Sequence, residues 1–135
     1  MPKFRTMKLN TPDVATHLLK DSSQYITKVG FFLRKKSLDE LPQLWSILKG
    51  DMTLIGPRPA LYNQYDLINL RKTYGIHKLK PGITGLAQIS GRDALTIKQK
   101  VDFDLKYLNE KSLILDMKII CLTLLKVFGS EGIKH

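Results

Sequence analysis

One stretch near the middle of the chain, Ser37 to Pro59, constrains the fold most, because strong helix signals there alternate with rigid breaks. It reads SLDELPQLWSILKGDMTLIGPRP, and its first four residues fit a helix capping box. Leucines and a tryptophan then recur at helical spacing and predict one apolar helical face. Gly50 ends this helix, and we expect the apolar run from Met52 to Ile55 to be a short buried strand that the Gly-Pro-Arg-Pro loop stops. Because Pro42 lies inside the helix, its first turn should be bent or leave a free carbonyl at Leu38.

The rest of the chain reads mainly as helix. Thr11-Pro12-Asp13 has an N-cap residue followed by proline, so we expect a helix from there towards Lys20. Residues 96–109 carry an apolar stripe at helical spacing. Residues 83–89 look extended, with an interruption at Gly85. These patterns predict an α+β fold, a helix-rich single domain with a few short strands and amphipathic helices able to lie on a membrane surface.

The last long segment, from Ser112 to Phe128, leaves two interpretations open. At helical spacing its polar residues gather on one arc of about 80° and almost everything else is apolar. That pattern fits a helix packed in the core or an interfacial membrane helix that lies in the headgroup layer. No stretch of the chain reaches the roughly 18 uninterrupted apolar residues expected of a spanning helix.

Composition limits the partners. The 135 residues suit one domain, and a formal net charge of +10 implies an anionic partner, either nucleic acid, acidic lipid or a phosphorylated small molecule. No nucleic-acid reader motif accompanies the charge, so we do not expect nucleic acid. Cys121 is the only cysteine, which fits a reducing compartment.

The acid pair Asp39-Glu40 stands out in so basic a chain. At the start of a helix, carboxylates are stabilised by the helix dipole, so a purely structural role would explain them. The same position keeps them ionised, as a carboxylate nucleophile or a Mg²⁺ ligand requires. The two roles are compatible.

Two arginines flank this pair. Arg58 lies between two prolines, which reduces the freedom it loses on binding, and with Arg34 it would suit a phosphate clamp. Further basic residues either extend that surface or only keep the protein soluble. They are Lys35, Lys36, Lys78, Lys80 and Arg92.

Several long motifs together resemble one family. They are KFRTM from Lys3, LRKKSLDELPQLWSILKGDM from Leu33, IGPRP from Ile55 and KPGITGLAQISGR from Lys80, followed by FDLKYLNEKSLILDMKI from Phe103. In this order, and over nearly the whole chain, the set is similar to the bacterial sugar transferases, the monotopic polyprenyl-phosphate phosphoglycosyl transferases.

The resemblance implies an enzyme. Members transfer a sugar phosphate from a UDP-sugar to undecaprenyl phosphate, release UMP and so start a lipid-linked glycan for exopolysaccharide, capsule or O-antigen. The expected place is the cytoplasmic face of the bacterial inner membrane, with an anionic membrane surface and downstream glycosyltransferases as further partners.

The resemblance also implies residue roles. Asp39 matches the nucleophile, which would form an aspartyl-phosphosugar intermediate, and Glu40 matches the residue that holds Mg²⁺. Lys3, Arg34 and Arg58 match basic residues expected to contact phosphates. With these bases and Mg²⁺ nearby, a carboxylate can approach a diphosphate despite its like charge.

One departure from the family pattern concerns the start of the chain. Members are expected to begin with a re-entrant membrane helix before Lys-Phe-Arg-Thr-Met, whereas Met1 lies two residues before Lys3. We therefore expect residues 1–135 to form the catalytic domain in an N-terminally truncated form. Two alternatives follow. The chain is an enzyme at the membrane, or it is an inactive remnant that binds nucleotide sugar, membrane or a partner. If membrane association depends on the N-terminal anchor, we expect the chain to be soluble in the cytoplasm.

Overall fold

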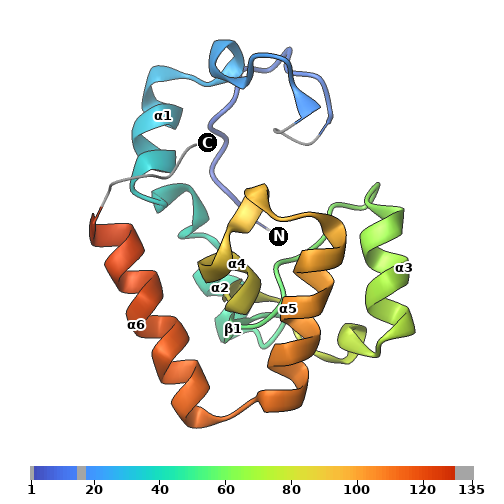
Figure 1. Cartoon of the computed structure of the whole chain (residues 1–135). Helices are drawn as coiled ribbons and strands as arrows, with labels where there is room; N and C mark the ends of the chain where they lie inside the picture. The colour runs from blue at the N-terminus through green and yellow to red at the C-terminus, as the bar shows by residue number, and fades with distance from the viewer. Residues whose placement is uncertain (1, 15–17, 130–135) are drawn as a thin grey trace.

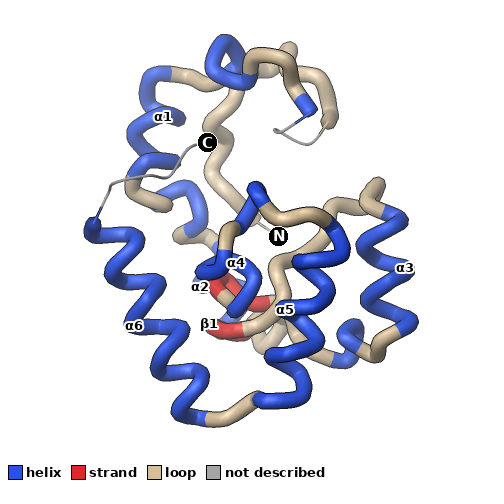
Figure 2. The backbone as a smooth tube through the Cα atoms, in the orientation of Figure 1, coloured by secondary structure: helices blue, strands red, loops and turns tan. Residues whose placement is uncertain are grey.

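A computed structural model describes residues 2–14 and 18–129 of the chain (Figure 1). Within this part, helices dominate and a single short parallel sheet lies among them (Figure 2). The helix-rich α+β prediction is thus confirmed. The elements in chain order are the 3₁₀ helix η2 (Ser22–Tyr25), α1 (Lys28–Lys35), η3 (Leu38–Glu40), α2 (Gln43–Leu48), β1 (Thr53–Ile55), α3 (Tyr65–Thr73), η4 (Ile76–Lys78), β2 (Gly82–Thr84), α4 (Leu86–Ser90), η5 (Arg92–Ala94), α5 (Ile97–Glu110) and α6 (Leu113–Gly129).

The sheet brings two distant loops together. β1 pairs with β2 in parallel, with Thr53 opposite Gly82 and Ile55 opposite Thr84, and the crossover between them runs through α3. A Cβ added at Gly82 would lie 2.1 Å from the backbone nitrogen of Gly56. Only a residue without a side chain therefore lets the two strands approach so closely.

The core forms between α3, η4 and α5. Leu67, Ile76 and Val101 are buried together, and four partly buried apolar residues pack against them. The predicted helix over residues 96–109 is confirmed as α5, which starts with a capping box between Thr96 and Gln99. Its apolar stripe contributes Val101 to the core.

The capping-box prediction at Ser37 is wrong. Ser37 adopts a left-handed conformation with φ of 54°, and its N–H donates to the Arg34 carbonyl, so it ends α1 instead of capping the next helix. The first turn is a separate 3₁₀ helix, η3, and α2 begins only after Pro42. The Leu38 carbonyl is not free, because it accepts a hydrogen bond from the Leu41 N–H.

Other predicted boundaries also shift. Thr11 to Val14 are not helical, and residues 15–17 of that predicted helix lie outside the described part of the chain. The strand predicted at residues 52–55 is confirmed as β1, but its predicted burial is wrong, because Leu54 is exposed and Thr53 and Ile55 are only partly buried. In residues 83–89 the extended backbone stops at Thr84, because α4 begins at Leu86 and its first hydrogen bond runs from Ile89 to Gly85.

The N-terminal segment starts near α4 in the view of Figure 1 and then runs along α1. It is held by a bridge between Met7 and Ile26 and by the Thr6 carbonyl, which accepts a hydrogen bond from the Thr27 N–H. A Cβ added at Gly30 would lie 2.1 Å from that carbonyl. Gly30 therefore allows the segment to lie against α1.

The last helix, α6, is oriented with its polar arc towards the domain. Asp116 accepts a hydrogen bond from Tyr107, the Thr123 and Thr84 hydroxyls lie 2.7 Å apart, and Lys126 donates to the Ile89 carbonyl. The apolar face points outward, and Ile114 is 84% exposed. Ile119 is buried, but Leu113, Ile114 and Phe128 are exposed, so α6 packs against the domain along one side and is not enclosed in the core. The interfacial interpretation of this helix stays a prediction.

We find no helix in residues 2–14 and 18–129 that combines the length and the apolar character needed to cross a bilayer.

Candidate functional site

The acid pair lies in η3, between two helices. Asp39 and Glu40 are 7% and 9% exposed, although charged residues rarely lie so deep without partners. The left-handed turn at Ser37 directs the chain into η3, and the Asp39 carbonyl accepts a hydrogen bond from the Phe4 N–H. The N-terminal segment thus fixes the backbone beneath the pair.

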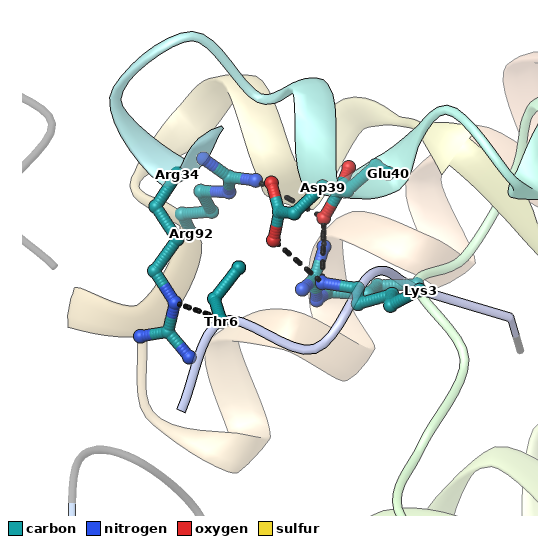
Figure 3. A network of polar contacts seen from close by, with 7 residues as sticks. Lys3, Thr6, Arg34, Asp39, Glu40 and Arg92 are labelled. Carbon is teal, nitrogen blue, oxygen red and sulfur yellow. Dashed lines mark hydrogen bonds and ion pairs between the residues drawn. The ribbon is translucent and has the colours of Figure 1, made fainter. Parts of the chain in front are cut away.

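Three cationic side chains meet one oxygen of Glu40. Lys3 Nζ lies 2.9 Å, Arg58 Nη1 3.3 Å and Arg92 Nη2 3.7 Å from Oε1. Lys3 Nζ is also 4.0 Å from Oδ2 of Asp39, so it bridges the two acids. In Figure 3, Lys3 and Arg92 reach the carboxylates from different sides.

These cations determine the ionisation of Glu40. Burial alone would raise the pKa of this carboxyl, but the charges of Lys3, Arg58 and Arg92 and the hydrogen bond from Lys3 outweigh burial and hold the pKa below its usual value. Glu40 is therefore a carboxylate at neutral pH, in a cluster with excess positive charge.

Arg34 occupies the edge of this cluster. Its Nε donates to the Thr6 hydroxyl at 2.8 Å, and Thr6 is itself buried. That hydrogen bond fixes the guanidinium stem, as Figure 3 shows. Of the five predicted site residues, Lys3 contacts both Asp39 and Glu40, Arg58 contacts Glu40, and Arg34 is held through Thr6.

Arg58 projects from the loop after β1. Pro57 and Pro59 restrict the backbone on both sides of it, and the Pro57 carbonyl accepts a hydrogen bond from the Gly82 N–H. The close approach of Gly56 and Gly82 places this loop next to β2. The rigid loop then presents the Arg58 guanidinium to Glu40.

Arg92 is the site residue that the sequence did not single out. It was one of several basic residues with two open interpretations, and another of them, Lys80, instead donates to the Gly50 carbonyl. The φ of Arg92 is 54°, an uncommon value for a residue with a side chain. The Gly91-Arg92 pair is the available sequence signal, because a glycine permits the sharp turn that brings the arginine back to Glu40.

The donor set fits Mg²⁺ bound largely by substrate. Within residues 2–14 and 18–129, no cluster of three or more acidic, histidine or cysteine side chains could enclose a metal. Mg²⁺ commonly uses one or two carboxylates and completes its shell with water and substrate phosphates. Asp39 and Glu40 meet that requirement, and the three cations engage only one of the two Glu40 oxygens.

An exposed apolar surface begins directly after the acid pair. The predicted apolar face of α2 is not buried: Leu41, Leu44 and Leu48 are exposed and Trp45 is 62% exposed. Val29, Phe31 and Phe32 of α1 are exposed as well. Exposed apolar area of this extent marks a contact with a protein or a membrane.

The site therefore combines a buried acid pair, cations able to bind phosphates and an adjoining apolar surface. These features define a class of site in which basic side chains able to bind phosphate groups lie beside an apolar surface.

Comparison with known proteins gives the family. The family described as "Bacterial sugar transferase" matches residues 1–130. The chain therefore belongs to the bacterial sugar transferase family, as its motifs predicted.

Individual relatives agree with this assignment. The "Uncharacterized sugar transferase EpsL" of Bacillus subtilis (strain 168) is 48% identical over 133 residues, which are 98% of this chain and 64% of that protein. The "Galactosyl transferase CpsE" of Streptococcus agalactiae serotype III (strain NEM316) is 41% identical, over 98% of this chain and 32% of the relative.

A third relative carries a more specific name. The "UDP-glucose:undecaprenyl-phosphate glucose-1-phosphate transferase" of Escherichia coli (strain K12) is 44% identical over 96% of this chain and 30% of its own length. The chain thus spans less than two thirds of each of these relatives.

Proposed function

We propose that this chain transfers a sugar phosphate from a UDP-sugar to undecaprenyl phosphate, releases UMP and starts a lipid-linked glycan such as an exopolysaccharide, capsule or O-antigen. The observation that carries the proposal is the buried acid pair under three cations, Lys3, Arg58 and Arg92. The names of several relatives, which include a UDP-glucose:undecaprenyl-phosphate glucose-1-phosphate transferase and an exopolysaccharide production protein, support the reaction class.

Asp39 is the nucleophile in this proposal. A carboxylate oxygen of Asp39 forms a bond to the phosphorus that carries the sugar, and the bond from that phosphorus to the UMP oxygen breaks, so UMP leaves with the electron pair. A phosphate oxygen of undecaprenyl phosphate then attacks the same phosphorus and frees Asp39. No proton has to be removed from the nucleophile, because carboxylate and phosphate are both ionised.

The basic residues hold the phosphates. Lys3 and Arg92 stabilise the negative charge that develops on the departing UMP. The planar guanidinium of Arg58 donates hydrogen bonds to two phosphate oxygens. Glu40 would hold Mg²⁺ together with the substrate phosphates, and the ion would neutralise negative charge on the diphosphate. Glu40 keeps the cations assembled before substrate arrives.

The exposed apolar face supports a lipid substrate and a place at the membrane. α2 starts beside the acid pair, and the outward face of α6 carries exposed apolar residues over most of its length. An interfacial helix of this kind gains from apolar burial and from the positive charge of the chain towards acidic lipids. We place the chain at the cytoplasmic face of the bacterial inner membrane.

A second candidate function is an inactive domain that binds a nucleotide sugar, a membrane or a partner. Binding alone would need only the cations around Glu40 and the exposed apolar residues of α1 and α2, and the structure contains both.

The test is UMP release from a panel of UDP-sugars with Mg²⁺ and undecaprenyl phosphate in nanodiscs. We expect release by the chain and no release by Asp39→Asn, which keeps the size of the side chain but removes its charge. Asp51→Asn is the matched control, because Asp51 is exposed on the loop after α2 and should leave the rate unchanged.

The outcomes separate the two candidates. Release that depends on Asp39 supports the transferase and names the sugar. If the folded chain releases no UMP from any donor on the panel, the binding domain is the better account.

A further inference from the structure

A buried ion pair lies behind the phosphate-binding loop. Arg71 of α3 pairs with Asp104 of α5, and their side chains are 11% and 3% exposed. Arg71 Nε and Nη2 donate to the same oxygen of Asp104, at 3.0 and 2.8 Å. Neither residue carries a role in the proposed chemistry.

The third nitrogen of Arg71 reaches the functional loop. Arg71 Nη1 donates to the backbone carbonyl of Arg58 at 2.8 Å. One guanidinium therefore joins α3, α5 and the Gly-Pro-Arg-Pro loop.

Stability alone is a weak explanation for this pair. Burial raises the pKa of Asp104 above its usual value, although the charge and hydrogen bonds of Arg71 act in the opposite direction. Burying two charges often costs about as much as their attraction returns, and apolar replacements of similar size can be neutral. The geometry of the fork towards Arg58 accounts for an arginine better than packing does.

The hydrogen bond falls where the loop still has freedom. The rings of Pro57 and Pro59 fix their own φ angles, but the orientation of the Arg58 carbonyl depends on the ψ angle of Arg58. Arg71 holds that carbonyl, and Nη1 of the Arg58 guanidinium lies 3.3 Å from Oε1 of Glu40.

We propose that Arg71, oriented by Asp104, is a positioning residue that sets the direction in which Arg58 presents its guanidinium to the substrate phosphates. This inference rests on the proposed function for its kinetic consequence, but the restraint on Arg58 is a property of the free protein. Arg71 acts through Arg58 and touches neither acid of the pair in the structure.

Two variants separate positioning from folding. Arg71→Lys keeps a positive charge for Asp104, but an ammonium lacks the fork that reaches both Asp104 and the Arg58 carbonyl. The double variant Arg71→Met with Asp104→Leu removes both buried charges together, so no charge is left unpaired. Tyr107→Phe is the control, because it removes another interhelical hydrogen bond, to Asp116, away from the loop.

The first readout is NMR relaxation of the Arg58 Nε–H group, assigned by its loss in Arg58→Lys. We expect this group to be ordered in the wild type and in Tyr107→Phe, and clearly more mobile in both Arg71 variants. An Arg58 signal of unchanged order in a folded Arg71 variant overturns the inference, whether or not the chain is active.

The second readout is a double-mutant cycle on kcat/KM for UMP release. We expect Arg71→Lys to lower kcat/KM by about tenfold or more, as small misplacements of a phosphate-binding group do. In an Arg58→Ala background the same change should have almost no effect, because the group it positions is gone. If Arg71→Lys lowers kcat/KM equally in both backgrounds, the positioning role is overturned. If the wild type releases no UMP, that result counts against the proposed function, and the NMR measurement alone decides the positioning role.

Discussion

At the scale of single residues, the site is built from contacts between positions far apart in the chain. Lys3 meets Glu40 across 37 positions and Arg34 meets Thr6 across 28. Local pattern identified the acid pair because adjacent carboxylates stand out in a basic chain, and it identified Arg58 because prolines flank it. It could not identify Thr6 or Arg71, since a lone threonine or arginine has no local signature until the fold supplies its partner.

The Thr6 hydroxyl offers a first residue-scale prediction. Thr6→Val has nearly the same shape but cannot accept the hydrogen bond from Arg34 Nε. We expect a loss of about 1 to 3 kcal/mol in the free energy of unfolding, typical of a hydrogen bond to a charged group, together with weaker substrate binding. Urea unfolding and KM for the UDP-sugar measure the two effects.

Thr6→Ser is the matched control for this prediction. It keeps the hydroxyl and should retain the wild-type KM. If Thr6→Val and Thr6→Ser have the same KM, the hydrogen bond does not position Arg34.

At the scale of elements, the sequence predicted regular helices better than the short segments that carry the site. α5 follows its periodicity because Thr96 and Gln99 form a local capping box. Ser37 has the same local signature but ends α1 in a left-handed turn, and the Glu40 carboxylate, which a capping box would direct to the Ser37 N–H, instead binds three cations from elsewhere in the chain. Tertiary electrostatics thus overrode a local capping preference.

The contact between α1 and the N-terminal segment can be tested at Gly30. Alanine favours a helix interior over glycine by about 1 kcal/mol, so Gly30→Ala should be stabilising if only the helix mattered. Its Cβ would instead meet the Thr6 carbonyl, which must then move with the rest of the segment that carries Lys3. We expect a net destabilisation of about 1 to 3 kcal/mol, as in overpacked cores, and reduced UMP release.

Gly129→Ala provides the comparison. Gly129 also lies in a helix, but no atom lies within 4 Å of an added Cβ. This variant should be as stable and as active as the wild type. Equal behaviour of the two alanine variants in thermal unfolding would refute a steric role for Gly30.

At the scale of the whole molecule, part of the surface carries apolar side chains where a soluble protein usually has polar ones. The polar arc of α6 faces the domain and its apolar face points outward, and α1 and α2 add further exposed apolar residues. The amphipathic pattern of α6, with polar residues on one arc and apolar residues elsewhere, could be predicted from the sequence. Which side faced the domain was not, because that depends on partners such as Thr84 and Tyr107 on other elements.

The single tryptophan reports on membrane contact. Trp45 is exposed on α2, so its emission should shift to the blue and gain intensity when anionic vesicles are added. Ile114→Asp places a charge on the outward face of α6 and should weaken vesicle binding several-fold. Asn109→Asp adds the same charge at an exposed position of α5 and should have a much smaller effect.

An unchanged Trp45 spectrum at saturating vesicle concentration, with no sedimentation of the chain alongside the vesicles, would contradict the proposed membrane surface. Equal binding by Ile114→Asp and Asn109→Asp would exclude α6 from the contact.

The covalent step at Asp39 is the central claim, and intact-protein mass spectrometry tests it most directly. The chain is incubated with its UDP-sugar and Mg²⁺ in the absence of undecaprenyl phosphate. We expect the mass to rise by one sugar phosphate, the adduct to disappear when undecaprenyl phosphate is added, and Asp39→Asn to show no adduct. UMP release and lipid product with no adduct at any time, and with Asp39→Asn as fast as the wild type, would contradict the account.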